Sequence, residues 1–511
     1  MHRFKTIYFP KKRVKSEHAT RVNISIPPAT DKNGWGESFL NKVFELSGVQ
    51  VRSLLGDPML DHLEEEASKE HRSLSNVILS LLYSKFEEGK FDNISSSSSN
   101  IKDNKGVGVT FSDSLRKSSF GWYPYVEGFS ANYARDALLR EVSKPLAVYD
   151  PFGGSGTTQL AASLLGIKSY YSELNPFMVK VCEAKVMSAN WARNNFKIFK
   201  DNAEEYISQI SRSNIEKLAK DVCLKSYSEA FPKRDFFEEE HLRHLLAALD
   251  IAKAYDTVNP HLGSIFSIAC TANAVASSNM TRRADLRRRR PDEYKNRVVD
   301  VPKMIATTVR RMIDDVSGYP ENSAETKLVS NDAKKIPDSY TEKFDFVLTS
   351  PPYLNGTNYF RNTKLELWLM SLIDSEKDLK KFRELTVTGG INDVSKKVNY
   401  EKFDSVEIVA GKLDLKSKDK RIPTMVRHYF SDMYEVMTGV YRSMKPEGKF
   451  LLDIGDSKFY GVHVPTHKLL LDVAEKIGFK LEHEHVLAKR MSRDKTELVQ
   501  VELVFKKSAL C

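Results

Sequence analysis

The chain has 511 residues, a formal net charge of +10 and a pI of about 9.0. Its 41% hydrophobic and 29% charged residues are typical of a globular protein with two or three domains. The chain has no long apolar run, which argues against a membrane span, and no apolar secretion signal, which argues against an exported protein. It has no Cys-x-x-Cys pair, which argues against a structural zinc or other metal site. We therefore expect a cytoplasmic protein, and the basic balance fits a polyanionic partner.

Residues 1–91 form an N-terminal accessory region whose role the sequence leaves open. Leucine and valine residues at helical spacing over 58–91 predict a small helical module. The basic run 11–15 fits either a nucleic-acid contact or an ordinary solvated surface. Residues 92–118 are predicted to be a linker, because five consecutive serines lie there among Asn, Asp and Lys.

A glycine-rich turn follows a helix-like segment at 131–142 and a short apolar strand predicted over 145–149. The turn reads Asp150-Pro151-Phe152-Gly153-Gly154-Ser155-Gly156-Thr157-Thr158, and a helical pattern begins directly after it. Glycines allow a sharp turn and a close approach of a ligand, and the helix N-terminus offers free N–H groups. The segment is not a Walker loop and lacks the third glycine of the dinucleotide motif, so a strand–turn–helix without a ligand remains the alternative.

A second strand is predicted over 168–173 and ends in Glu173. An acid at this place in a Rossmann-like unit accepts hydrogen bonds from ribose hydroxyls. The glycine turn and Glu173 together therefore predict a nucleoside-bearing cofactor.

Residues 188–325 form an insertion before the next predicted strand, with helical patterns at 241–254 and 304–316. The insertion contains an arginine-rich segment: Arg282, Arg283, Arg287, Arg288, Arg289 and Arg290. Such a cluster can neutralise several phosphates, and this predicts DNA binding. A solvated, charged helix face is the alternative.

Two further strands are predicted, over 326–330 and 343–349. Asp332 follows the first, and the second ends in Thr349 and continues into Ser350-Pro351-Pro352-Tyr353. Ligands of open α/β sheets bind at the carboxyl ends of the strands, so the glycine turn and the Pro-Pro turn are expected to face the same crevice.

The two turns together resemble the motifs of S-adenosylmethionine-dependent DNA amino-methyltransferases, which methylate cytosine N4 or adenine N6. The resemblance covers the chain from about residue 121 to the C-terminus. The form Leu348-Thr349-Ser350-Pro351-Pro352-Tyr353 is more typical of the cytosine-N4 group. The glycine turn comes first in this chain, unlike the permuted order common in that group, and this keeps adenine N6 open.

The resemblance implies an α/β protein with a Rossmann-like class I methyltransferase sheet of seven strands. The catalytic domain comprises residues 119–187 and 326–511, and the helical insertion 188–325 separates its two parts. Beyond the motifs, we expect a polar loop over 374–421, a helix over 425–444, a turn over 445–448, a strand over 449–454 and a helix over 466–477. Two strands over 481–487 and 498–505 form the C-terminal antiparallel hairpin.

The resemblance also implies which residues bind the S-adenosylmethionine cofactor. They are Tyr123, Asp150, Phe152, Gly153, Gly154, Ser155, Gly156, Thr157, Thr158, Glu173, Asp332 and Thr349. For Asp332, which corresponds to the partner of the adenine amine, capping of the next turn is the alternative. The match around Tyr123 is weaker, and Trp122 and Tyr125 beside it fit a core position equally well.

The catalytic residues implied by the resemblance are Ser350, Pro351, Pro352 and Tyr353. An exocyclic amine is a poor nucleophile, and the Ser350 hydroxyl and the Pro351 carbonyl can accept its hydrogens. The two prolines stiffen the turn, and Tyr353 can stack on a base flipped out of the duplex. The motif contains no base, so the proton is expected to leave to water or a weak acceptor. The sequence near the glycine turn contains no Pro-Cys pair. This argues against methylation of cytosine C5, which needs covalent attack by a thiolate.

These observations favour a site-specific DNA methyltransferase of a restriction–modification or defence system, with cytosine N4 as the target and adenine N6 as the second choice. Its partner would be double-stranded DNA with the target base flipped, together with a possible cognate restriction endonuclease or defence-system subunit. The alternatives are an RNA methyltransferase and a non-catalytic DNA-binding subunit.

Overall fold

A computed structural model gives the structure of the chain. It describes residues 3–9, 20–26, 114, 118–125, 128–141, 147–282, 285–295, 297–320, 323–354, 359–394, 399–492 and 494–508. The chain divides into two compact units, Met1–Lys105 and Gly106–Cys511, and this division lies within the predicted linker 92–118.

The first unit contains an antiparallel pair of strands, β1 (Arg3–Phe9) and β2 (Thr20–Ile26), which the sequence analysis did not predict. The predicted helical module over 58–91 and the basic run 11–15 lie outside the described residues. The role of this unit therefore stays open.

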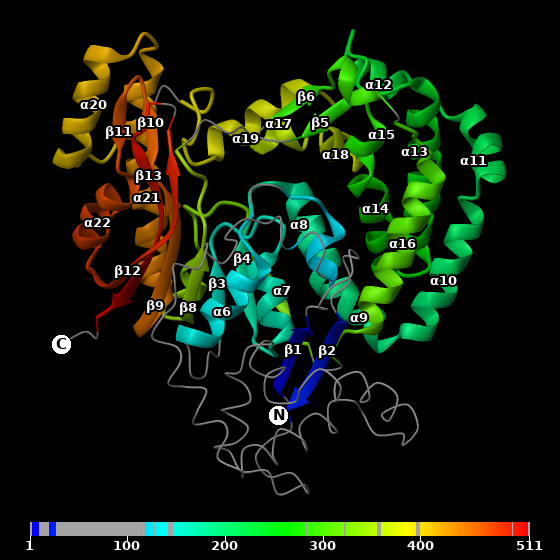
Figure 1. Ribbon diagram of the computed structural model, residues 1–511, viewed down its shortest axis with the longest axis horizontal. Helices are drawn as coiled ribbons and strands as arrows, with labels where there is room; N and C mark the ends of the chain where they lie inside the picture. Colours follow the sequence, from blue (N-terminus) through cyan, green and yellow to red (C-terminus); the bar gives the residue numbers. More distant parts are fainter. Residues whose placement is uncertain are drawn as a thin grey trace, which may run out of the picture. The chain divides into compact units, whose positions relative to one another are not determined.

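The second unit is built around a seven-stranded sheet with the order β12-β13-β9-β8-β3-β4-β7 (Figure 1). The strands are β3 (Val148–Asp150), β4 (Ser169–Ser172), β7 (Thr326–Ser330), β8 (Phe344–Thr349), β9 (Met444–Gly455), β12 (Phe479–Met491) and β13 (Glu497–Lys507). The first five run parallel to one another, whereas β13 is antiparallel to both of its neighbours, β9 and β12. This order and the reversed strand confirm the predicted Rossmann-like class I methyltransferase fold with its C-terminal hairpin.

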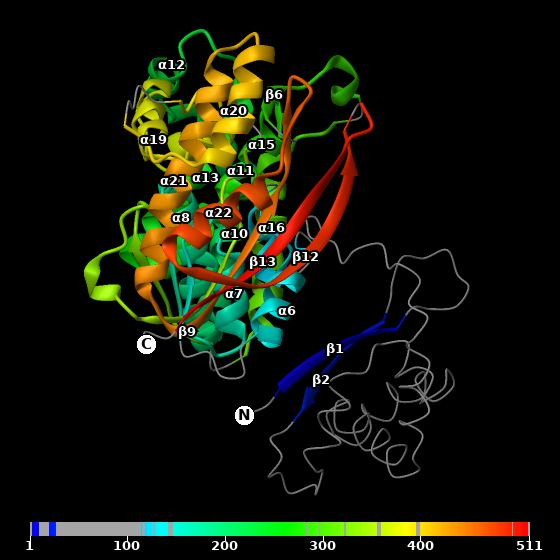
Figure 2. The same cartoon turned by 90° about the vertical axis from the view of Figure 1, so that its left-hand side faces the viewer.

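Each face of the sheet carries its own apolar core, because successive side chains of a strand point to opposite faces. On β8, Val347 belongs to one core, and Phe346 and Leu348 belong to the other. The first core includes helices α20 (Asp404–Lys416), α21 (Arg421–Ser443) and α22 (Thr466–Ile477), which Figure 2 shows along one side of the sheet. The second includes α6 (Ala131–Glu141), α7 (Thr157–Leu164), α8 (Pro176–Glu183) and the insertion.

The insertion is mainly helical, as predicted. Its helices are α9 (Ala189–Asn194), α10 (Phe196–Gln209), α11 (Arg212–Leu218), α12 (Lys225–Ala230), α13 (Glu239–Ala254), α14 (Pro260–Ala272), α15 (Ala274–Ser277) and α16 (Val301–Ser317). At the start of α16 the Asp300 carboxylate accepts a hydrogen bond of 3.1 Å from the Lys303 N–H, which caps the helix. None of the helices described is long and apolar enough to cross a membrane.

Two local predictions and one alternative interpretation were wrong. The region 374–421 is not one long loop, since it contains α19 (Leu379–Leu385) and α20, whose apolar residues pack against the two cores. The predicted turn 445–448 lies inside β9 as an irregularity at which Glu447 adopts a φ of 66°. The arginine-rich segment is not a helix, because β5 (Met280–Arg282) and β6 (Leu286–Arg288) form a short antiparallel ladder there.

Candidate active site

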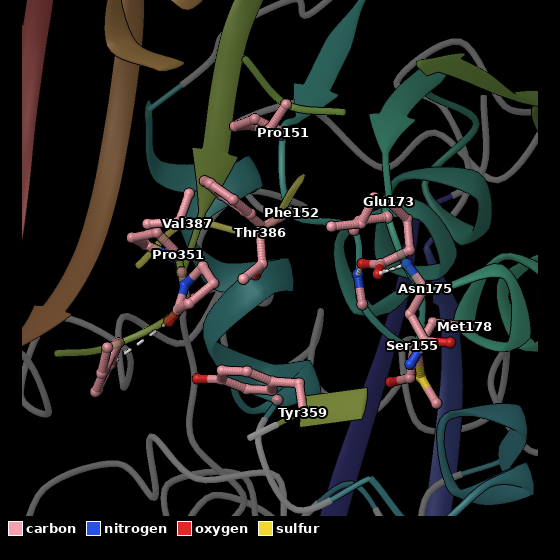
Figure 3. Close-up of a pocket in the computed structure, with 18 of the residues that line it drawn as sticks. Pro151, Phe152, Ser155, Glu173, Asn175, Met178, Pro351, Tyr359, Thr386 and Val387 are labelled. Carbon is pink, nitrogen blue, oxygen red and sulfur yellow. Dashed lines mark hydrogen bonds between the residues drawn. The ribbon is translucent and has the colours of Figure 1, made fainter. Parts of the chain in front are cut away.

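A cavity of about 310 Å³ lies where the carboxyl ends of β3, β4 and β8 meet. Residues of both sequence motifs line it. Figure 3 shows Ser155, Glu173, Asn175 and Met178 on one side, with Pro351, Thr386 and Val387 opposite. The prediction that the glycine turn and the Pro-Pro turn face the same crevice is therefore confirmed.

The glycine turn has a conformation that other residues adopt only with strain. Gly154 has a φ of 50° and Gly156 a φ of 80°, both in the left-handed region. A Cβ atom on Gly156 would also lie 2.8 Å from the Cys182 sulfur. Below the turn, the buried Lys185 ammonium donates a hydrogen bond of 3.0 Å to the Ser155 carbonyl, and burial lowers its pKa to about 7.

Glu173 lies at the end of β4 with its carboxylate held by two backbone amides. One oxygen accepts from the Asn175 N–H at 2.7 Å, and the other accepts from the Gly154 N–H at 2.8 Å. Burial nevertheless raises the pKa of this carboxyl to about 7. A carboxylate oxygen can accept a second hydrogen bond, so Glu173 has capacity for ligand hydroxyls in the cavity.

Asp150 and its partners lie below the cavity and connect the two motifs. Its carboxylate accepts hydrogen bonds from the Thr158 hydroxyl at 2.7 Å, the Thr349 hydroxyl at 2.6 Å and the Phe152 N–H at 3.0 Å. Burial raises its pKa to about 6. Thr349 ends β8, so these bonds fix the start of the Pro-Pro turn relative to the glycine turn.

The structure separates the predicted cofactor residues into two sets. The cavity is lined by Phe152, Gly153, Gly154, Ser155, Thr157, Glu173 and Asp332, whereas Asp150, Gly156, Thr158 and Thr349 do not belong to its lining. At Asp332, one carboxylate oxygen accepts a 3.0 Å bond from the Lys334 N–H, so the capping role exists as well.

Tyr123 lies away from the cavity, in the core. Its ring packs edge-on against Phe177, and its hydroxyl lies 3.0 Å from the Glu366 carboxylate and 2.8 Å from the Arg282 guanidinium. From the same region of the sequence, Tyr125 and Phe129 line the cavity instead. The local sequence did not distinguish these aromatic residues, because all of them are apolar enough for a core.

The Pro-Pro turn forms the other end of the cavity, where Ser350, Pro351, Pro352 and Tyr353 all contribute to the lining. The Tyr353 hydroxyl donates a hydrogen bond of 3.1 Å to an Asp453 oxygen. It accepts a hydrogen bond of 3.4 Å from the Ser350 hydroxyl. Burial, followed by the Asp453 charge, raises the pKa of Tyr353 well above its ordinary value, so its hydroxyl keeps its proton.

Asp453 and Gln500 were not predicted from the sequence. Asp453 lies on β9, and the Gln500 amide on β13 donates to its two oxygens at 2.8 and 3.0 Å. Burial raises the pKa of the Asp453 carboxyl to about 6. One signal was available, since an acid interrupts the apolar strand Leu451-Leu452-Asp453-Ile454, and a buried acid is rare unless it is paired or functional.

Comparison with known proteins identifies curated relatives over most of the chain. A Type II methyltransferase from Nostoc sp., M.AvaI, is 22% identical over 417 residues, covering 74% of this chain and 83% of the relative. M.BsoBI from Geobacillus stearothermophilus is 23% identical over 448 residues (76% and 84%), and M.MvaI from Kocuria varians is 22% identical over 355 residues (64% and 74%). The chain is similar to Type II methyltransferases.

No model of a known protein family matches the chain. Among solved structures, a SAM-dependent methyltransferase from Methanosarcina mazei aligns with a TM-score of 0.27 at 7% identity, over 73% of this chain and 98% of that one. An rRNA methyltransferase from Streptomyces viridochromogenes aligns with a TM-score of 0.26 at 9% identity, over 79% and 94%. These scores are too low to carry an argument, so the fold assignment rests on the strand order.

The predicted DNA-binding arginines fall into different environments. The prediction that Arg282 binds DNA is corrected. Its side chain is 7% exposed and forms an ion pair with the buried Glu366, so it cannot reach a phosphate on the surface. Arg287 pairs with Glu293 through two hydrogen bonds of 2.8 Å, and Arg288 pairs with Asp235. Arg289 is partly buried, Arg290 is exposed and Arg283 lies outside the described residues. DNA binding by these surface arginines stays a prediction.

Proposed function

We propose that this protein is a site-specific DNA methyltransferase of a restriction–modification system, which transfers a methyl group from S-adenosylmethionine to the exocyclic N4 amine of cytosine. The observation that carries the proposal is that the glycine turn with Glu173 and the Ser350–Tyr353 turn line one cavity. The similarity to Type II methyltransferases supports the reaction class and the DNA substrate. A cognate restriction endonuclease is the partner that such a system implies.

The glycine-turn end of the cavity fits the nucleoside part of the cofactor. Glu173 offers carboxylate oxygens for ribose hydroxyls, Asp332 offers an acceptor for an amine, and Phe152 provides an apolar surface for a flat ring. A Cβ atom on Gly154 would lie 3.3 Å from the Tyr125 ring, so the glycine allows this ring to pack closely against the turn at the cavity wall. S-adenosylmethionine supplies, when bound, an electrophilic methyl group on a sulfur that keeps the bonding electron pair.

At the other end, the protein has to orient a weakly nucleophilic amine. The Ser350 hydroxyl and the Pro351 carbonyl are acceptors on a turn that two prolines stiffen, and they can hold the two amine hydrogens. The Tyr429 hydroxyl donates a 3.0 Å bond to the Pro352 carbonyl, which fixes the turn from behind. An amine held in this way would keep its lone pair available for the methyl group.

Asp453 accepts the proton that the nitrogen releases. Once the N–C bond has formed, the nitrogen is cationic and must lose one hydrogen as a proton to become the methylated amine. The Ser350 and Tyr353 hydroxyls link the amine position to Asp453, and a carboxylate with a pKa of about 6 is ionised at neutral pH. The sequence analysis found no base because Asp453 lies 100 residues beyond Tyr353.

Cytosine N4 is preferred over adenine N6 because Thr349-Ser350-Pro351-Pro352-Tyr353 has the form typical of the cytosine group. Adenine N6 is the alternative, and the same site residues would serve it. The order of the motifs along the chain is the reason to test the base directly.

The test is mass spectrometry of nucleosides from the DNA of cells that express the protein. N4-methylcytosine is expected, and it must disappear with a Ser350→Ala, Tyr353→Ala double variant that still binds S-adenosylmethionine in calorimetry. N6-methyladenine would correct the base and retain the mechanism. If the cellular DNA is unmethylated although the purified protein binds the cofactor, the proposal is contradicted. Labelling of RNA would then assign an RNA substrate.

A further inference from the structure

A second pocket of about 580 Å³ lies between the β5–β6 ladder and the helices after the Pro-Pro turn. Cationic side chains dominate its lining: Lys233, Arg234, Arg287, Arg288, Arg361, Lys364 and Arg383. Only two carboxylates, Asp235 and Glu376, share the lining. Two acids outside the lining also pair with it, Glu293 with Arg287 and Asp285 with Arg361. An excess of three positive charges therefore remains around one concave surface, and it attracts an anion and repels a cation.

The acids in the pocket do not neutralise this charge. Glu376 contacts both Lys364 and Arg234, and Asp235 pairs with Arg288. No hydrogen-bond partner within the described part of the chain reaches the buried Nε atom of Arg383. A buried guanidinium N–H without a partner costs free energy, so a ligand that accepts its hydrogen bond would be stabilised there.

The pocket adjoins the candidate active site through one layer of short helices. In α17 (Tyr359–Asn362), Tyr359 and Phe360 line the first cavity, whereas the next residue, Arg361, lines the second pocket. In α19, Leu385 lines the first cavity and Arg383 the second pocket. The Phe360 ring of α17 stacks on Phe382 of α19 with centroids 4.8 Å apart, which joins the two helices.

We propose that this basic pocket binds a backbone phosphate of the DNA strand that carries the target base, close to the nucleotide that enters the active site. The inference rests on the proposed function and adds where the strand is held. A phosphate matches planar guanidinium groups through paired hydrogen bonds, and phosphate contacts set the register of a protein on its DNA. Arg287 and Arg288 are thereby joined by Arg361, Lys364 and Arg383, which the sequence did not suggest.

The principal test compares the wild type with an Arg361→Gln, Arg383→Gln double variant. DNA affinity is measured by fluorescence anisotropy of a labelled duplex at several salt concentrations. We expect the affinity to fall about tenfold at low salt and the slope of log K against log salt to become smaller by about one, as for the loss of one phosphate contact. Calorimetric binding of S-adenosylmethionine should not change, because neither side chain lines the first cavity.

Two further variants exclude a general loss of charge or of folding. Arg212→Gln removes an exposed arginine of α11, which lies at the outer edge of the insertion in Figure 1, and should leave the affinity and the salt slope unchanged. Asp235→Asn removes an exposed carboxylate of the pocket and should tighten binding several-fold, which a damaged fold would not do. Equal losses for the Arg212 variant and the double variant would overturn the proposal.

Competition separates the possible sources of the phosphate group. Inorganic phosphate, duplex DNA and structured RNA are each tested against the labelled duplex. The proposal predicts strong competition by duplex DNA and weak competition by inorganic phosphate at the same phosphate concentration. Displacement by inorganic phosphate alone would assign the pocket to a free anion and overturn it. If nucleoside analysis instead shows no DNA methylation while the double variant still loses duplex binding, the proposed reaction fails and the pocket assignment stands.

Discussion

The two ends of the candidate active site are built in different ways. Apart from Asp332, the glycine-turn end comes from one stretch of chain, in which Gly154 and Asn175 hold Glu173 within about twenty residues. The Pro-Pro end brings together Tyr353 from the turn after β8, Asp453 from β9 and Gln500 from β13, and its hydrogen bonds span 100 and 147 residues. The first end depends on local backbone conformation, and the second depends on the pairing of β13 with β9.

This difference predicts that substitutions at the two ends have different effects. At the glycine-turn end the constraints are steric and concern positive φ angles and close contacts, so substitutions there should affect stability and cofactor affinity. At the Pro-Pro end the constraints are hydrogen bonds around a buried acid, so substitutions there should affect the rate. The predictions below test this division, from the largest expected effect to the smallest.

Replacement of Asp453 by Asn should have the largest effect. The variant keeps the shape and removes the proton acceptor, so we expect kcat for DNA methylation to fall at least about 100-fold, as for the loss of a general base. Cofactor affinity should be retained, since Asp453 lies at the other end of the cavity.

The pH profile provides the control for Asp453. In the wild type, kcat should fall as the pH decreases through about 6, because the carboxyl then becomes protonated. This acidic limb should be absent from the residual activity of the Asp453→Asn variant. A variant with nearly full activity and an unchanged profile would show that the proton leaves to water.

Replacement of Glu173 by Gln should weaken binding of S-adenosylmethionine about 10- to 100-fold, because a hydrogen bond to a charged acceptor contributes about 1.5–3 kcal/mol. Isothermal titration calorimetry measures this directly. At saturating cofactor, kcat should approach the wild-type value. A fall in kcat without a change in affinity would contradict the division between the two ends.

Replacement of Gly156 by Ala should destabilise the protein by about 1–3 kcal/mol, because the new Cβ contacts Cys182 and the residue has a φ of 80°. Gly411 in α20 is the matched control, since a Cβ there meets no atom within 4 Å. Gly411→Ala should stabilise the protein by about 0.5–1 kcal/mol. Urea unfolding of both variants tests the contrast, and equal effects would contradict it.

The pH dependence of stability should be the smallest effect. The folded state raises the pKa of Glu173 from its ordinary value to about 7, so between pH 4.5 and 7 it binds more protons than the unfolded chain. The contribution of this group to the free energy of unfolding is therefore full below pH 4.5 and is lost as the pH rises through 7. Thermal melting of Glu173→Gln should show a smaller decrease over this interval than that of the wild type.

The sequence alone determined much of the catalytic unit. Strand patterns and turns predicted the order of the sheet elements, and strand β7 matches its predicted bounds. The glycine turn, Glu173 and the Pro-Pro turn were found because each depends on neighbouring residues or on the shared carboxyl edge of parallel strands. The β1–β2 pair was missed, and nothing in its local sequence assigned it a function.

Only the tertiary structure decided which side chains meet across the chain. It placed Tyr123 in the core and Tyr125 at the cavity wall, two residues that the sequence could not separate because both fit an apolar environment equally well. It buried Arg282 against Glu366 and left Arg361 and Arg383 in a basic pocket, although neither belongs to the arginine-rich segment. It also brought Asp453 to Tyr353, because strand pairing between distant segments, which local patterns do not encode, sets the environment of a buried charge.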